Sequence, residues 1–295
     1  MVQINSILDT DLYKLTMQQA VLHQFPIATA KYRFTNRSPN MSFTIECLQL
    51  LKQAVGKLKD LTLTPDEKQW LSETCPYLSS EYLDYLEKYR FKPDQVIITF
   101  IPTSGDATKG QIEMEANGPW VETIIIKALS LWEEVYTPER GSALWISLTD
   151  TFSTDVFFRE FKEAPDYVKR WRLRQDSGDP IEYVKKAKAL YDSLGVDASE
   201  KPIVFSDSLN VVKAKAIQKA CDEAGLKACF GIGTFLSNDF QRSDGNGPSK
   251  ALNMVIKLYS INNIPCVKIS DDIGKNTGEK GAVKYVKDLF KIPEA

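Results

Sequence analysis

The sequence predicts an α/β protein in two parts: a mixed α/β domain over residues 1–140 and an incomplete β/α barrel over residues 141–295. Short apolar strands and amphipathic helices follow one another along the whole chain, but only the second part shows the strand–loop–helix order of parallel units. A closed β/α barrel needs at least about 200 residues. The second part has about 155 residues, room for about five units of roughly 30 residues each. The barrel should therefore be open.

Local patterns define the elements of the first part. Apolar residues from 13 to 21 recur on one face of a helix, and residues 30–35 alternate apolar with polar, as in a half-buried strand. A helix is expected over residues 45–58. Residues 64–67, Thr-Pro-Asp-Glu, form a capping box with proline at the first helical position. Two further strands are predicted, at 96–101 and 111–115.

The second part alternates strands with helices. The predicted strands are residues 143–148, 203–205, 228–230 and 254–259. The predicted helices are residues 180–194, 210–224 and 283–290. The polar, glycine-rich residues 241–249 are expected to form a mobile surface loop. In β/α proteins the loops that follow the strands carry the active site, so polar residues there are the first candidates for function.

Composition narrows the class of protein. Net charge is −2 and charged residues make up 26% in mixed order, so neither a nucleic-acid nor a membrane partner is expected. The apolar runs are too short to span a bilayer, and residues 1–4 do not resemble the start of a signal peptide. Five cysteines form no C-x-x-C pair, which is typical of reduced thiols in a cytosolic protein. We expect a cytoplasmic protein, with the nucleus as an alternative.

Three carboxylates follow three successive predicted strands. Asp150, Asp176 and Asp207 would lie side by side in a parallel array and could converge on one ligand. Carboxylates suit ribose hydroxyls, as acceptors, and Mg²⁺, as hard oxygen ligands. Nearby Asp179 and Ser208 have an alternative role, because either could instead cap the helix that follows.

Residues 230–234, Phe-Gly-Ile-Gly-Thr, follow a late strand. Glycines there let backbone N–H groups approach an anion, and late loops of barrels recurrently bind phosphate. A lone G-x-G is more often a simple turn. The third glycine of a dinucleotide-binding fingerprint is absent.

Two basic residues have competing interpretations. Arg174 could face a phosphate or an aromatic carboxylate, or could be a solvated arginine close to the basic run at 169–172. His23, the single histidine, lies late in the first predicted helix and is expected to be structural or on the surface.

Nine segments in order resemble the nicotinate phosphoribosyltransferase family, and the chain is identified as an internally truncated member. One of them is Arg-Gln-Asp-Ser-Gly-Asp-Pro at 174–180. The others are residues 8–17, 32–37, 118–124, 148–152, 205–209, 230–234, 238–240 and 268–271. The resemblance implies that the open barrel is of the irregular type II phosphoribosyltransferase kind.

The resemblance also implies a reaction and its participants. Similar enzymes join nicotinate to 5-phosphoribosyl 1-diphosphate, form nicotinate mononucleotide in the salvage branch of NAD biosynthesis, and hydrolyse ATP as a co-substrate. Mg²⁺ and a homodimer are implied as well. By residue, Tyr13 would pack on nicotinate across the dimer interface, Arg174 would face the pyridine ring, and Asp176 would hold ribose hydroxyls or Mg²⁺. The 5′-phosphate would lie against Gly231, Gly233 and Thr234, with Asp207 nearby.

One family segment has no counterpart in this sequence. Between the matches at 118–124 and 148–152 the family carries Phe-Gly-Thr-Arg-Arg-Arg and Gly-Thr-x-x-His-Glu-Trp, whose histidine is phosphorylated by ATP. Here only residues 125–147 intervene, and neither motif occurs. No catalytic histidine of the family is retained, which predicts that this chain does not turn over nicotinate. The alternatives are a working phosphoribosyltransferase, an inactive form that dimerises or binds a phosphosugar, and a general phosphosugar-binding protein with other chemistry.

Overall fold

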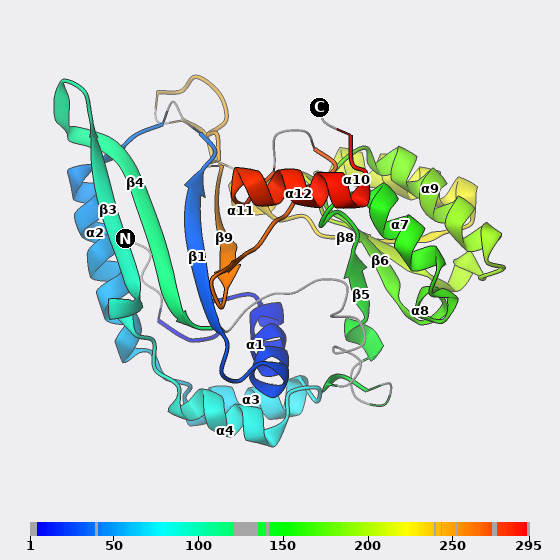
Figure 1. The fold of residues 1–295 in the computed structure, drawn as a ribbon, viewed down its shortest axis with the longest axis horizontal. Helices are drawn as coiled ribbons and strands as arrows, with labels where there is room; N and C mark the ends of the chain where they lie inside the picture. Colours follow the sequence, from blue (N-terminus) through cyan, green and yellow to red (C-terminus); the bar gives the residue numbers. More distant parts are fainter. Residues whose placement is uncertain are drawn as a thin grey trace. The chain divides into compact units, whose positions relative to one another are not determined.

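The computed structural model divides the chain into two compact units (Figure 1). Unit 1 comprises Met1–Ser142 with Asn253–Cys266, and unit 2 comprises Ala143–Leu252 with Val267–Ala295. The structure describes residues 5–38, 41–120, 135–137, 139, 142–238, 240–242, 244–251, 253–272 and 276–293. The matched residues 121–124 and most of the short connection at 125–147 lie outside these ranges.

Unit 1 is built on an antiparallel sheet in the order β10-β9-β1-β4-β2, with β3 also paired to β4. Its strands are β1 (Thr29–Asn36), β2 (Phe43–Thr44), β3 (Val96–Thr103), β4 (Asp106–Pro119), β9 (Met254–Ile261) and β10 (Ile264–Pro265). The predicted strands at 30–35, 96–101 and 111–115 are confirmed as parts of β1, β3 and β4.

The helices of unit 1 are α1 (Leu12–Gln24), α2 (Ile45–Lys57), α3 (Pro65–Thr74) and α4 (Ser80–Lys88). The predicted capping box at the start of α3 is confirmed. Thr64 Oγ1 accepts from the Glu67 amide at 3.3 Å, and Glu67 Oε2 accepts from the Thr64 amide at 2.8 Å. Two otherwise orphaned amides are thereby satisfied. Leu15, Leu71 and Leu86 then share one buried core that joins α1, α3 and α4.

The prediction that residues 254–259 belong to a parallel unit of the barrel is wrong. They form β9, which pairs antiparallel with β1 and returns through β10 as a hairpin. The predicted second domain, 141–295, counted these residues within it, whereas the structure groups 253–266 with unit 1. An apolar run gives no strand direction. The sequence does carry a signal at the turn, because it has two asparagines at 262 and 263. Both adopt a positive φ, as the central residues of a type I′ hairpin turn must.

Unit 2 contains a parallel sheet, sheet B, in the order β5-β6-β7-β8. Its strands are β5 (Ile146–Leu148), β6 (Arg172–Gln175), β7 (Pro202–Phe205) and β8 (Lys227–Phe230). Helices follow the strands: α7 (Thr154–Lys162), α8 (Pro165–Arg170), α9 (Pro180–Ser193), α10 (Val211–Ala224), the short α11 (Thr234–Ser237) and α12 (Lys280–Phe290). The predicted partial β/α barrel is confirmed.

Aromatic and aliphatic side chains close the core of unit 2. Leu173, Ile203 and Phe205, from the two central strands, are all fully buried. The Phe205 ring lies edge-on to Tyr183 of α9, with centroids 6.2 Å apart, and stacks on Phe230 at 6.0 Å. This layer lies at the carboxyl ends of β7 and β8, so it supports the loops that begin there.

Sheet B ends, among the described strands, at β5 on one side and β8 on the other. A strand with one neighbour leaves a row of unpaired N–H and C=O groups, which favours pairing with another chain.

We expect the protein to self-associate through β5 and to bind a dye specific for exposed apolar surface. Ile146→Lys should reduce association, because a charge on an edge strand opposes pairing. Val212→Lys, at an exposed position of α10, should not. Size-exclusion chromatography with light scattering measures this. A monodisperse, dye-free monomer would show that the edge is covered.

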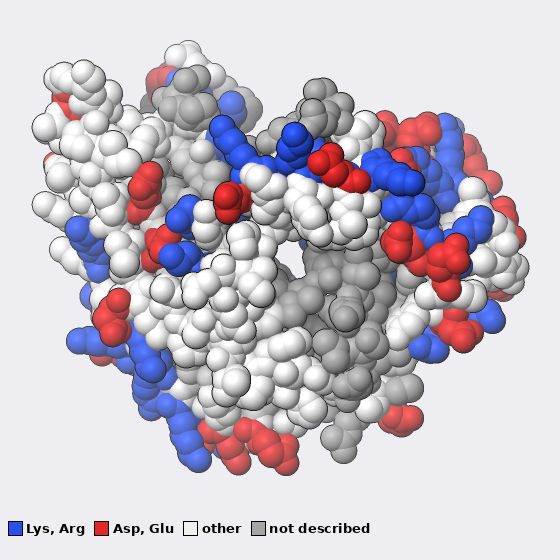
Figure 2. Space-filling view, in the orientation of Figure 1, with Lys and Arg blue, Asp and Glu red and all other residues white. Residues whose placement is uncertain are grey.

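The sequence has 37 basic and 39 acidic residues, which gives a net charge of −2. On the face shown in Figure 2, basic and acidic side chains are interspersed, and no patch of one sign dominates. Within the described part of the chain, no helix combines the length and apolar character needed to cross a bilayer.

Candidate functional site

Four loops lie side by side at the carboxyl edge of sheet B. Backbone hydrogen bonds join each loop to the next one, at the position where the loop follows its strand. The Thr149 amide donates to Arg174 O at 3.3 Å, the Ser206 amide donates to Gln175 O at 3.0 Å, and the Gly231 amide donates to Phe205 O at 2.8 Å. The predicted convergence of these loops is therefore present in the structure.

Arg174, Asp176 and Ser206 form a polar cluster that bridges β6 and β7. Arg174 Nη2 donates to Asp176 Oδ1 at 3.1 Å, and Arg174 Nε donates to Ser206 Oγ at 2.9 Å. Ser206 Oγ in turn donates to Asp176 Oδ1 at 2.7 Å. The Arg174 and Asp176 side chains remain 41% and 30% exposed, so a cation and an anion are held together and still open to a ligand.

Ser206 is a site residue that the sequence analysis missed. It follows β7 as Asp176 follows β6, and this equivalent position was the available signal. Asp176 Oδ2, by contrast, accepts no hydrogen bond from any described residue, so one oxygen remains available for a ligand.

Asp150 does not face the open edge of the sheet. Its side chain is 2% exposed, and its Oδ1 pairs with Lys268 Nζ at 3.0 Å. Its Oδ2 accepts from Ser177 Oγ at 2.7 Å. The prediction that the loops carrying the three carboxylates lie side by side is confirmed, but the prediction that Asp150 faces a shared ligand with the other two is wrong. Sequence position places a residue in a loop without giving the direction of its side chain.

Asp207 is half-buried in the loop after β7. Ser208 Oγ donates to Asp207 Oδ1 at 3.1 Å, and Ser208 has a positive φ of 50°. Ser208 does not cap α10. Asn210 does, because its Oδ1 accepts from the Lys213 amide at 2.9 Å.

Asp179 does cap a helix, as the alternative interpretation held. Its Oδ1 accepts from the amides of Ile181 and Glu182, at 2.7 and 3.0 Å, at the start of α9. Its carboxylate therefore caps the N-terminus of α9, where the loop after β6 ends.

The glycine loop after β8 is open. A Cβ added at Gly231 would lie 3.4 Å from Ser206 Cβ, while nothing lies within 4 Å of one added at Gly233. The amides of Ile232 and Gly233 donate to no described backbone or side-chain acceptor. Thr234 is exposed and begins α11. Amides beside glycines that have no acceptor among the described residues can approach an anion closely, so the loop suits a phosphate.

Tyr13 and His23 lie on α1 in unit 1. Tyr13 is 50% exposed, and Lys14 Nζ lies 4.9 Å from the centre of its ring. His23 is exposed in the last turn of α1, with Nδ1 3.4 Å from Gln24 Nε2. The prediction of a structural or surface histidine is confirmed as a surface one.

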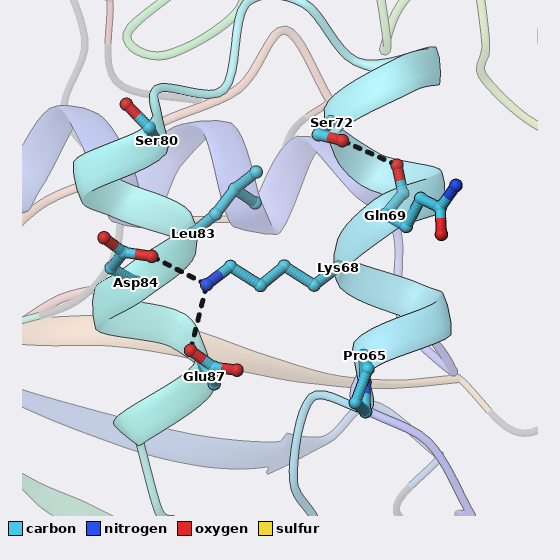
Figure 3. A pocket seen from close by; sticks show the side chains of 8 residues that line it. All are labelled: Pro65, Lys68, Gln69, Ser72, Ser80, Leu83, Asp84 and Glu87. Atoms are coloured by element: carbon cyan, nitrogen blue, oxygen red, sulfur yellow. Dashed lines mark hydrogen bonds and ion pairs between the residues drawn. The ribbon is translucent and has the colours of Figure 1, made fainter.

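A hollow of about 380 Å³ between α3 and α4 contains none of the predicted site residues. Figure 3 shows Lys68 reaching from α3 to Asp84 and Glu87 of α4, with Nζ–O distances of 2.6 and 2.9 Å. The charges in this hollow therefore satisfy one another. Its lining residues are Pro65, Lys68, Gln69, Ser72, Ser80, Leu83, Asp84 and Glu87.

Comparison with known proteins places the chain in a family of phosphoribosyltransferases. The family model for the nicotinate phosphoribosyltransferase N-terminal domain matches residues 8–131, and that for the nicotinate phosphoribosyltransferase family matches residues 95–294. The chain belongs to the nicotinate phosphoribosyltransferase family.

Relatives and solved structures resemble the chain over nearly its whole length. Nicotinate phosphoribosyltransferase of Saccharomyces cerevisiae is 30% identical, with 99% of this chain and 96% of that protein covered. The Methanosarcina mazei enzyme is 30% identical, with 95% and 97% covered. A crystal structure of nicotinate phosphoribosyltransferase from Porphyromonas gingivalis matches with a TM-score of 0.84 and 27% identity, covering 98% of this chain and all of that one.

The two sequence alignments are longer than the chain itself. They extend over 413 and 404 residues, whereas the chain has 295. More than one hundred aligned positions in these relatives therefore have no counterpart here.

Proposed function

We propose that this chain serves nicotinate phosphoribosyl transfer, in which nicotinate and 5-phosphoribosyl 1-diphosphate give nicotinate mononucleotide and pyrophosphate. The observation that carries the proposal is the carboxyl edge of sheet B, where Arg174, Asp176 and the open loop at 231–234 adjoin. Curated relatives that bear this name, at 30% identity, support it.

The residues at this edge divide the substrate between them. Gly231, Gly233 and Thr234 would hold the 5′-phosphate, with Asp207 beside them, and Asp176 would accept from the ribose hydroxyls. Arg174 would face the pyridine ring of nicotinate. In the transfer, the bond from the ribose carbon C1 to the pyrophosphate oxygen breaks and a bond from that carbon to the pyridine nitrogen forms. Donors and acceptors fixed in advance favour such a charged transition state.

Mg²⁺ is the metal we propose, and the side chains at this edge fit it. No cluster of three or more histidine, cysteine or carboxylate ligands occurs among the described residues. Mg²⁺ does not need one, since it is usually held by one or two carboxylates together with substrate phosphates. Asp176, with one oxygen available, would hold it, and the ion would neutralise charge on the departing pyrophosphate.

The assembly and location are part of the same proposal. We propose a homodimer in which half-exposed Tyr13 of one copy packs on nicotinate bound to the other. All five cysteines are free thiols, which suits a reducing cytoplasm.

A second candidate is a phosphosugar-binding or dimerisation partner that performs no turnover. This candidate agrees with the prediction from the sequence that the chain does not turn over nicotinate. More than one hundred positions of the relatives have no counterpart here, and the chain has a single histidine, and both facts favour this candidate. One assay separates the two candidates: purified protein is incubated with nicotinate, 5-phosphoribosyl 1-diphosphate and Mg²⁺, with and without ATP, and nicotinate mononucleotide is measured by mass spectrometry. Product above that of an Asp176→Ala control supports the transferase. No product, with the diphosphate sugar still bound, supports the binding partner.

ATP is a co-substrate in the family, and we expect it to leave this chain unmodified. Its one histidine, His23, is an exposed residue of α1 and belongs to none of the loops that follow the strands of sheet B. Incubation with ATP labelled at the γ-phosphate should give no acid-labile label and no stimulation of product formation. Acid-labile label on the wild-type protein that disappears in His23→Ala would contradict this expectation.

A further inference from the structure

Residues 268–272 join the loops that follow β5 and β6. Beside the ion pair of Lys268 with Asp150, the Ile269 amide donates to Thr151 O at 2.8 Å. Asp271 accepts from both the amide and the hydroxyl of Thr154, the first residue of α7. Burial raises the pKa of the Asp271 carboxyl, and these hydrogen bonds act against that rise.

The buried carboxylate of Asp150 lies at the centre of these contacts. Lys268 neutralises one oxygen, and the other accepts from Ser177 at 2.7 Å and from Ser270 at 3.4 Å. A buried charge is tolerated only when it is paired and hydrogen-bonded. The Asp150 carboxylate therefore has a fixed orientation, in which its Oδ2 accepts a hydrogen bond from Ser177.

Ser177 directly follows Asp176, the proposed ribose ligand. Ser177 is 3% exposed and turned inward, while Asp176 is partly open to solvent. Two further bonds hold the same turn: Gln175 Nε2 donates to Ser177 O at 2.8 Å, and the Gly178 amide donates to Asp272 Oδ1 at 3.3 Å. Gly178 has a φ of +74°, a conformation that favours glycine. The backbone at Asp176 is thus fixed from its buried side.

We propose that Asp150 is a positioning residue for Asp176. Its carboxylate, neutralised by Lys268, anchors Ser177 and so holds the loop at 176–178 in the shape that presents Asp176 to a phosphosugar. The ligand part of this proposal rests on the proposed function, whereas the anchoring itself does not.

Hydrogen exchange measured by mass spectrometry tests the anchor without any ligand. Ser177→Ala and Asp150→Asn should each speed amide exchange in residues 176–179 at least several-fold. The matched control is Ser147→Ala, which removes an equally buried hydroxyl that has no hydrogen-bond partner among the described residues. It should leave exchange in that loop unchanged. Unchanged exchange in both anchor variants would overturn the proposal.

Binding tests the consequence of the anchor. Ser177→Ala should weaken ribose 5-phosphate binding about tenfold in protein that remains folded, while inorganic phosphate, which we propose residues 231–234 hold, competes as well as before. General damage to the fold would weaken the binding of both ligands.

The double variant of Ser177→Ala and Asp150→Asn tests whether the two residues act together. It should bind ribose 5-phosphate no more weakly than the single variant with the lower affinity, because both changes break the same hydrogen bond. Additive losses, or ribose 5-phosphate affinity unchanged in Ser177→Ala, would overturn the positioning role. Failure of the wild-type protein to bind either ligand would instead overturn the proposed function, and exchange would still decide the anchor.

Discussion

Replacing Asp176 by asparagine should weaken binding of 5-phosphoribosyl 1-diphosphate with Mg²⁺ by about 10- to 100-fold. Asparagine keeps an oxygen for Arg174 and Ser206, so the local structure should survive while the negative charge is lost. A hydrogen bond to a charged group contributes about 1.5–3 kcal/mol, and each 1.4 kcal/mol is tenfold in affinity. Isothermal titration calorimetry measures the change directly.

The matched control for this substitution is Asp155→Asn. Asp155 is 76% exposed and pairs with Lys186 on the surface, at 2.6 Å. Exposed ion pairs contribute little to stability, so this variant should bind the diphosphate sugar as the wild-type protein does. Equal affinities of the two variants would remove Asp176 from the proposed site.

Replacing Phe205 by alanine should lower the free energy of unfolding by about 3–5 kcal/mol, the range for removing a buried aromatic ring. Phe205 is fully buried between Tyr183 and Phe230, at the end of β7. Total stability of a typical domain is about 5–15 kcal/mol, so the variant should be marginal. Urea denaturation gives the value.

The control for the Phe205 variant is Phe240→Ala. Phe240 is 63% exposed, and surface substitutions usually change the unfolding free energy by no more than about 0.5 kcal/mol. A loss for Phe205→Ala as small as that for Phe240→Ala would show that the layer beneath the loops is not a close-packed core.

Local signals in the sequence predicted many of the elements, although the strand predicted at 143–148 is only β5 at 146–148, because residues 142–144 form a 3-10 helix. The capping box at Thr64, the cap at Asp179 and the strand–loop–helix order of unit 2 all depend on residues close in sequence. The direction of β9 does not, since its partner β1 lies more than two hundred residues away. Ser208 was one candidate for the cap of α10, but Asn210 supplies it. Both side chains are capable of capping, and only the path of the backbone chooses between them.

The site was predictable to the level of loops but not of side chains. Asp176 and residues 231–234 lie at the edge where strand order places them. Asp150 is equally close to that edge in sequence, yet Lys268, from 118 residues further on, draws its carboxylate inward. Such a pairing depends on the tertiary fold, and spacing along the chain gives no sign of it.

We expect the carboxyl edge of sheet B to act as a phosphoribosyl site even though more than one hundred positions of the relatives have no counterpart in this chain. Calorimetry on the 295-residue chain with Mg²⁺ tests it most directly, comparing 5-phosphoribosyl 1-diphosphate, ribose 5-phosphate and nicotinate. We expect both sugar phosphates to bind, and nicotinate to bind more weakly than either, because we expect much of the pyridine pocket to lie in the positions that the relatives have and this chain lacks. Tight binding of nicotinate, with none of either sugar phosphate, would contradict the claim.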